Sequence, residues 1–240
     1  MTEIKFRPAS KFNVFESWPS HWPDKEHFAN QHDVRLAQRQ ELFRLLAEGV
    51  TEREMERFLG RNAEVLALIP FIYSTGHHAA WIYPKAQIRP PNDNIRGLIP
   101  DYILAGANSD GVSWFVLELK GPRERAFVRH DSHISLSPAA NKGVCQLLNY
   151  IDVASRTQAY LRDEIQLTGF REPRGILMIG TDEESKDDSV REFKAAWNRM
   201  HPNLQIRSYN ALLRVVDSKL TDFKRWPISQ NDTDASKSET

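Results

Sequence analysis

Three residues near the middle of the chain have the types and spacing of a metal-dependent hydrolytic site: Asp101, Glu118 and Lys120. Two carboxylates offer hard oxygen ligands, which suit Mg²⁺ or Mn²⁺ better than zinc. A lysine two residues after the second carboxylate points into the same site and can orient a water or offset charge on a transition state. With Asp101 and Glu118 as metal ligands, the set predicts hydrolysis of a phosphodiester.

A purely structural interpretation competes with the catalytic one, because an isolated Glu-x-Lys on a strand is more often an exposed ion pair. Glu118 and Lys120, however, lie in the otherwise apolar run Phe-Val-Leu-Glu-Leu-Lys. Burying both charges without a function would be costly. The composition of this run therefore favours a catalytic role.

A β-hairpin is expected to bring the three residues together. A run of turn formers at 106–111 separates two apolar runs, which is a hairpin signal. If all six residues form the loop, Asp101 lies opposite Val116. Because side chains alternate along a strand, Asp101, Glu118 and Lys120 then share one face, with the two carboxylates as diagonal neighbours at roughly 7 to 8 Å.

A helix after the hairpin supplies further polar side chains. Ser137 is suited to be its N-cap and is followed by a first-turn proline, a combination typical of helix starts. Lys142, Gln146 and Tyr150 are spaced by four and therefore lie on one stripe of this helix. Such a stripe is suited to positioning the water and to gripping backbone phosphates.

The polar segment between the Glu-x-Lys strand and this helix contains Arg123, Arg125 and Arg129. Its place beside the expected site favours contact with a phosphodiester backbone, although a merely solvated loop explains it equally well. The acidic run at 182–188 would repel a nucleic acid. We therefore expect that run on a surface away from the substrate or in a partner contact.

The rest of the chain completes a mixed α/β pattern. Two helices are expected at 34–47 and from Thr51, where Thr51 and Glu54 have the spacing of a capping box. A buried strand, a helix, a short strand and a last helix follow the hairpin and its helix. The pattern predicts an α/β fold with a mixed central sheet flanked by helices. The expected division is an N-terminal arm at 1–33, a domain at 34–226 and a disordered polar tail at 227–240.

Composition sets the class of protein but leaves nucleic-acid binding open. The 240 residues include 32 Lys and Arg against 32 Asp and Glu, and no apolar run approaches the length of a membrane helix. A single cysteine, Cys145, cannot form an internal disulfide, so a cytoplasmic protein without a membrane partner is the expectation. Because the net charge is zero, any binding of DNA must come from a local arrangement of charge.

The ordered motifs Ile-Pro-Asp-Tyr-Ile-Leu-Ala-Gly, Phe-Val-Leu-Glu-Leu-Lys-Gly-Pro and Gln-Leu-Leu-Asn-Tyr resemble the PD-(D/E)xK nuclease superfamily. With the helix that begins near Thr51 and the later Gly-Ile-Leu-Met-Ile-Gly, they look like the nuclease domain of the Shedu anti-phage defence proteins. The resemblance spans roughly residues 51–216. It implies a restriction-endonuclease-like fold and a Mg²⁺-dependent or Mn²⁺-dependent DNA endonuclease that assembles as a homo-oligomer.

The resemblance also implies site residues. Asp101 and Glu118 match the metal ligands, Lys120 the catalytic lysine and Gln146 the helix partner, while Tyr150 fits the Gln-x-x-x-Tyr pattern of exonuclease-like members. Many members add a glutamate from the helix before the sheet, for which Glu54 is the first candidate and Glu56 the second. Two alternatives stay open: a nucleic-acid-binding or assembly module that needs another component to cut, and an RNA-directed nuclease.

Overall fold

The computed structural model describes residues 18–88, 98–131 and 133–225, so the predicted tail at 227–240 lies outside the described residues. The strands are β1 (Phe28–Ala29), β2 (Ala79–Pro84), β3 (Tyr102–Asn108), β4 (Gly111–Leu119), β5 (Phe127–His130), β6 (His133–Leu136), β7 (Arg174–Met178) and β8 (Leu204–Arg207). The helices are α1 (Leu36–Glu48), α2 (Glu52–Arg61), α3 (Ala63–Leu66), α4 (Pro138–Arg156), α5 (Gln158–Asp163), α6 (Asp188–Met200) and α7 (Tyr209–Arg225). Short 3₁₀ turns are η1 (Lys25–His27), η2 (Gln31–Asp33), η3 (Ile69–Tyr73) and η4 (Asp182–Lys186).

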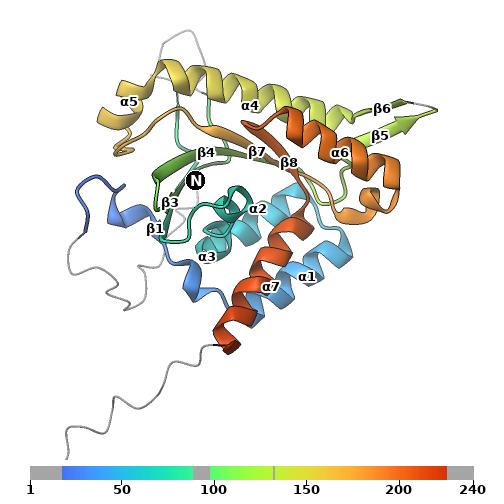
Figure 1. Cartoon of the computed structure of the whole chain (residues 1–240), viewed down its shortest axis with the longest axis horizontal. Helices are drawn as coiled ribbons and strands as arrows, with labels where there is room; N and C mark the ends of the chain where they lie inside the picture. The colour runs from blue at the N-terminus through green and yellow to red at the C-terminus, as the bar shows by residue number, and fades with distance from the viewer. Residues whose placement is uncertain (1–17, 89–97, 132, 226–240) are drawn as a thin grey trace, which may run out of the picture.

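A six-stranded mixed sheet, in the order β1-β2-β3-β4-β7-β8, is the centre of the described chain (Figure 1). Neighbours from β1 to β4 run antiparallel, whereas β4, β7 and β8 run parallel. The strand β7 is buried along almost its whole length, as expected for a parallel strand covered on both faces. The predicted mixed α/β fold with helices on the sheet is confirmed.

Helices cover both faces of the sheet. On one face, α4, α5 and α6 pack over a core that contains Val116 of β4 and Leu147 of α4. On the other, α1, α2 and α7 enclose a second core with Phe115 of β4 and Leu212 of α7. Because alternate residues of β4 enter different cores, Glu118 belongs to the face that carries α4.

The β3–β4 hairpin is tighter than the sequence predicts. Asn108 pairs with Gly111, so the loop has two residues instead of the expected six, and Val116 lies opposite Ile103 rather than Asp101. The Asn108 side chain accepts a hydrogen bond from the Asp110 amide at 2.9 Å, which closes the turn. The register therefore differs by two residues from the prediction, and an even shift keeps every side chain on its predicted face.

The described part of the predicted arm is joined to the sheet. The short strand β1 pairs with β2 at the sheet edge. Trp18 and Trp22 pack their rings edge-on against Trp81 of β2, with centroid distances of 6.0 and 5.1 Å. These contacts explain the unusual pair of tryptophans, because they cover an apolar surface of the sheet. In the ranges that the structure describes, no helix is long and apolar enough to span a bilayer.

Candidate active site

Glu118 and Lys120 lie together at the carboxyl end of β4. Their side chains are buried, with 6% and 11% exposed, and the Lys120 Nζ lies 2.7 Å from the Glu118 Oε1. The Lys120 amide donates to the Met178 carbonyl at 2.8 Å, which extends the pairing of β4 with β7. The backbone of Lys120 is also held from the second face, because the Tyr209 hydroxyl donates to its carbonyl at 2.8 Å. The pair is therefore fixed by the sheet and by the first residue of α7.

Asp101 directly precedes β3, and its side chain extends to the end of β4. Its Oδ2 accepts a hydrogen bond from the Leu119 amide at 2.8 Å. Burial raises the pKa of Glu118, and the negative charge of Asp101 raises it further, while Lys120 opposes both effects. Because the two carboxylates repel each other in a partly dry setting, a cation between them is favourable. The structure thus brings Asp101, Glu118 and Lys120 together, as the sequence predicts.

Lys85, which the sequence reasoning missed, is the second cation of this cluster. Its Nζ lies 2.5 Å from the Asp101 Oδ1 and 2.8 Å from the Glu56 Oε1. The Lys85 amide also donates to the Asp101 carbonyl at 3.1 Å. Lys85 directly follows β2 with a positive φ of 50°, a conformation uncommon for a residue with a side chain. The only signal in the sequence is its position after a strand.

The acidic residues of α2 divide between two roles. Glu54, the first candidate, closes a capping box: its carboxylate accepts hydrogen bonds from the Thr51 amide at 2.8 Å and hydroxyl at 2.7 Å. Glu52, which the sequence reasoning did not select, lies on the rim of the cluster. It keeps some exposure, but partial burial raises its pKa, with Lys120 and Asp101 as the largest charge effects. Glu56, the second candidate, shares the Lys85 ammonium with Asp101, whereas Glu54 is engaged in the cap.

The capping role of Glu54 gives a stability prediction. The bonds from Thr51 lower the pKa of the Glu54 carboxyl, so the ionised form stabilises the fold above the usual titration range of a glutamate. We expect Glu54→Ala to lower the thermal unfolding midpoint at pH 7. The difference in unfolding midpoint between Glu54→Ala and the wild type should shrink as the pH falls through that range, because protonation of Glu54 removes the same stabilisation from the wild type. A difference that stays constant between pH 7 and pH 3.5 in thermal unfolding would contradict this role.

Helix α4 presents Gln146 and Tyr150 to the cluster. Ser137 accepts the Ala140 amide at 3.0 Å, which confirms the predicted N-cap. The Tyr150 hydroxyl donates to the Ile99 carbonyl at 3.4 Å, and its pKa is raised first by burial and next by the charge of Glu118, while Gln146 lowers it. The Gln146 Oε1 is buried and has no hydrogen-bond partner among the described residues. An orphaned acceptor of this kind is costly unless something donates to it.

The donor chemistry of this cluster fits a hard cation. Asp101 and Glu118 offer carboxylate oxygens, and the free Oε1 of Gln146 is suited to accept from a water beside them. Within the described ranges, no three His, Cys, Asp or Glu side chains are placed to hold an ion together. Such an ion would therefore complete its ligands with backbone carbonyls and water.

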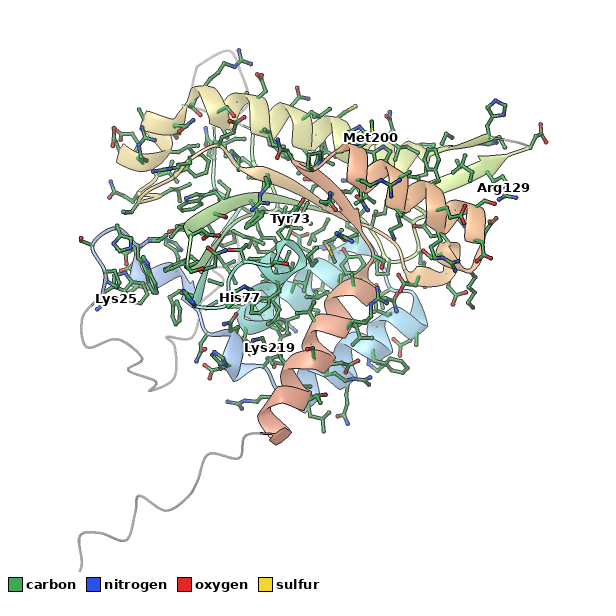
Figure 2. All side chains as sticks on the ribbon, viewed as in Figure 1. Lys25, Tyr73, His77, Arg129, Met200 and Lys219 are labelled. Atoms are coloured by element: carbon green, nitrogen blue, oxygen red, sulfur yellow. The ribbon has the colours of Figure 1, made fainter. Side chains whose placement is uncertain are left out.

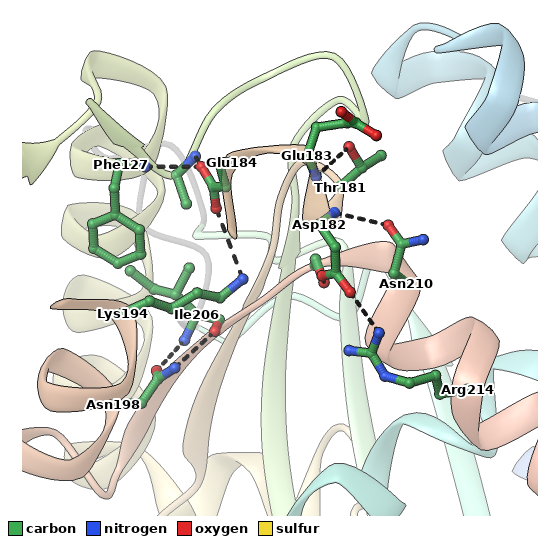
Figure 3. Close-up of polar contacts among 12 residues, drawn as sticks. Phe127, Thr181, Asp182, Glu183, Glu184, Lys194, Asn198, Ile206, Asn210 and Arg214 are labelled. Atoms are coloured by element: carbon green, nitrogen blue, oxygen red, sulfur yellow. Dashed lines mark hydrogen bonds and ion pairs between the residues drawn. The ribbon is translucent and has the colours of Figure 1, made fainter. Parts of the chain in front are cut away.

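The segment that contains Arg123, Arg125 and Arg129, called the basic loop below, is partly offset by acidic side chains. Arg129 pairs with Asp187 at 2.9 Å. Glu184 accepts the amides of Ala126 and Phe127 at 2.8 and 3.2 Å (Figure 3). The acidic run at 182–188, expected on a surface away from the substrate or in a partner contact, lies against this loop. The two segments are held together by the ion pair of Asp187 with Arg129 and by the Glu184 carboxylate of η4, which binds two backbone amides at the start of β5.

The other predicted substrate contacts are more open. Arg123 packs its side chain on Gly49 and donates to the Glu48 carbonyl at 3.4 Å. Arg125 is exposed and lines, with Arg123 and Arg129, a cleft of about 560 Å³ against η4. Lys142 is exposed one turn before Gln146 on α4. Of these cations, Arg125 and Lys142 keep the most freedom to meet a phosphate.

Together, the mixed sheet and the cluster of carboxylates and lysine at the end of its β3–β4 hairpin define a mixed α/β protein whose fold is consistent with that of nucleases. The family model described as Shedu protein SduA, C-terminal, matches residues 49–213. This match spans more than half of the chain, and the chain belongs to that family. Its membership supports a role in anti-phage defence. No curated protein matches the chain.

Proposed function

We propose that the chain is a metal-dependent DNA endonuclease of the Shedu type, which hydrolyses phosphodiester bonds in the cytoplasm during anti-phage defence. One observation carries the proposal: Asp101, Glu118 and Lys120 converge at the carboxyl end of the central strand β4. They lie beside α4, where the buried Gln146 Oε1 has no hydrogen-bond partner among the described residues. A cluster of perturbed carboxylates next to a buried lysine is expensive to fold and typical of catalytic sites. Family membership supports the same role.

Asp101 and Glu118 would hold the ion, Mg²⁺ or Mn²⁺, which when bound lowers the pKa of a water and offsets charge on the phosphate. The Lys120 ammonium, fixed at Nζ by Glu118, stabilises negative charge that develops on the phosphate oxygens. The Gln146 Oε1 accepts a hydrogen bond from the attacking water and sets its direction, with Tyr150 one turn further along α4. Arg125 and Lys142 bind flanking phosphates.

The second candidate is a module that binds nucleic acid or assembles but cuts only with another component. The acidic neighbours of the basic loop favour this module, because Asp187 forms an ion pair with Arg129 and the carboxylates of η4 lower the local positive charge. Affinity for DNA depends on how many phosphates are neutralised by free cations. A single copy of the chain therefore binds DNA weakly, and homo-oligomeric assembly would add the missing contacts.

The proposal is tested by cleavage of supercoiled and linear DNA with Mg²⁺, with Mn²⁺ and with EDTA. The wild type should cut only when the metal is present. Glu118→Gln keeps the shape of the side chain but removes a ligand charge, so the rate should fall by about 10²–10³-fold or more. Undiminished cutting by Glu118→Gln would contradict the assigned mechanism. If neither the wild type nor the variant cuts but both bind DNA, the result would favour the binding or assembly module.

Matched variants on α2 and a second substrate sharpen this experiment. Glu52→Gln and Glu54→Gln make the same change two residues apart, but only Glu52 interacts electrostatically with Asp101 and Lys120. Cleavage should fall for Glu52→Gln and persist for Glu54→Gln. RNA offered under the same conditions should remain intact, and preferential cutting of RNA would favour the RNA-directed alternative.

A further inference from the structure

A second pocket lies on the sheet face opposite α4, between η3, the end of β8 and α7. Its volume of about 460 Å³ is within the range of small-molecule sites. In Figure 2, Lys219 of α7 and Tyr73 of η3 lie on this side of the sheet, whereas Arg129 of the basic loop lies at the far end of the molecule. The pocket is therefore separate from the basic loop and from the cluster on the α4 face.

The polar wall of this pocket is cationic. Arg207 from β8, and Arg214 and Lys219 from α7, line it together with the Ser218 hydroxyl, and none of the described residues that line it is acidic. Asp182, outside this lining, already pairs with Arg214, so the charges of Arg207 and Lys219 are the ones that an anion in the pocket would offset. A guanidinium offers donors in a planar fork that matches phosphate oxygens.

Arg207 carries the clearest sign of a missing ligand. Its Nη2 donates to the Gln205 Oε1 at 2.9 Å, but its Nε is buried and has no hydrogen-bond partner among the described residues. Burial lowers the pKa of Arg207, and the nearby positive charge of Arg214 lowers it further. Arg207 lines the pocket, so a turn of its guanidinium toward a bound oxyanion would recover the free energy that the missing hydrogen bond costs.

Apolar side chains in the same lining suit the apolar part of a ligand. They are Phe71 and Ile72 of η3 and Val215 of α7. The Phe71 ring lies 4.4 Å from the Lys219 Nζ, so an aromatic surface and a cation stand side by side. A ring and a phosphate are joined in the same way in a nucleotide. We infer that this pocket binds a nucleoside phosphate, either free or at the end of a nucleic-acid strand, through Arg207, Arg214 and Lys219.

The pocket is connected to the end of β4 by a short path. The Arg214 Nη1 pairs with the Asp182 Oδ2 at 2.5 Å, and the Ser208 hydroxyl donates to the other oxygen of Asp182 (Figure 3). Ser208 directly precedes Tyr209, whose hydroxyl holds the Lys120 carbonyl. Arg214 lies about 7 to 8 Å from Tyr209 along α7, given 1.5 Å per residue. A ligand on Arg214 would therefore act on the helix that supports Lys120.

Calorimetric titration of the full chain in EDTA tests the inference without a contribution from the proposed metal site. The probes are dAMP, adenosine, inorganic phosphate and a 5′-phosphorylated oligodeoxynucleotide. We expect dAMP to bind, and adenosine and inorganic phosphate to bind more weakly, because each lacks one half of the ligand. Tighter binding of the oligonucleotide than of dAMP would assign the phosphate to a strand end, and the reverse would assign it to a free nucleotide.

Variants decide whether binding uses this pocket. Arg207→Gln and Lys219→Gln should each weaken dAMP binding by about tenfold or more, since hydrogen bonds to charged groups are the strong ones. The matched control Arg199→Gln removes the same charge from the exposed face of α6 and should bind like the wild type. The inference is overturned if no phosphate probe binds the wild type, or if Lys219→Gln and a folded Arg207→Gln both bind with unchanged affinity.

Discussion

Lys120→Met is expected to lower the free energy of unfolding by about 3 to 5 kcal/mol at neutral pH, because it leaves the Glu118 carboxylate buried without its partner. The Lys120 Nζ lies 2.7 Å from the Glu118 Oε1, and both side chains are almost fully removed from solvent. The loss reflects an uncompensated charge more than the strength of the ion pair. Urea unfolding of the two proteins in EDTA at pH 8 measures it.

The double variant Glu118→Leu/Lys120→Met is the matched control. It removes both charges at once, so no buried carboxylate or ammonium remains at the end of β4. Replacement of a buried pair by apolar side chains of similar volume is often neutral or stabilising. We therefore expect the double variant to recover most of the stability that Lys120→Met loses. A double variant that is less stable than Lys120→Met would mean that the pair contributes net stability.

The pH dependence of Lys120→Met has a definite sign. Burial and Asp101 already raise the pKa of Glu118 above its ordinary value, and Lys120 is the group that lowers it. Without Lys120 the folded-state pKa rises further above the unfolded one. For an acid with a raised pKa, the penalty is absent below the unfolded pKa and grows as the pH rises through the folded pKa. Lys120→Met should therefore approach the wild type in acid and fall behind it as the pH increases.

The predicted part of this cluster rests on the alternation of side chains along a strand. Asp101 and Glu118 share a face at any even shift of the hairpin, so the two-residue error in register left the prediction of their proximity intact. The error itself arose at 106–111, where Gly106 continues β3 instead of entering the loop. Residues that favour turns were counted as loop, although the pairing of β3 with β2 and β4 extends through them.

The missed part of the cluster depends on packing between elements that are distant in sequence. Lys85 meets Asp101 only because β2 lies antiparallel to β3. Glu52 lies near Lys120 only because the start of α2 packs beside Gly121, where a Cβ would be 3.5 Å from the Glu52 amide nitrogen. The capping box was readable from the sequence. It favours a structural role for Glu54, and the second candidate, Glu56, is the one that pairs with Lys85 of the cluster.

The β5–β6 hairpin and its acidic neighbour show the same limit. The segment that contains Arg129 was expected to be a polar loop, yet it forms paired strands held at their base by Glu184. Glu184 also lies 3.8 Å from Lys194 of α6, and both side chains are buried (Figure 3). Net charge alone could not reveal this pairing, because equal numbers of charges are compatible with both separated and paired arrangements. The basic loop is consequently a structural partner of η4 as well as a candidate contact for DNA.

Gly180→Ala is expected to lower the free energy of unfolding by about 2 to 5 kcal/mol, by adding backbone strain to a steric clash. Gly180 has a φ of +67°, and a Cβ added there would lie 2.4 Å from the Glu124 carbonyl oxygen. The obstacle is backbone and cannot rotate away as a side chain would. The Gly180 amide also donates to the Gly121 carbonyl at 3.2 Å, while its own carbonyl accepts the Tyr209 amide at 3.1 Å.

Gly111→Ala separates these two costs, because Gly111 also has a positive φ, of 112°, but a Cβ there meets nothing within 4 Å. Gly111→Ala should therefore show strain alone, and the excess loss in Gly180→Ala measures the clash. The clash pushes Glu124 and the turn from Gly121 away, and this turn directly follows Lys120. We accordingly expect Gly180→Ala, when folded, to impair DNA cleavage, while Gly111→Ala at the far end of the hairpin spares it. Equal unfolding free energies for the two variants would show that the turn yields without cost, and Lys120 would then need no support from Gly180.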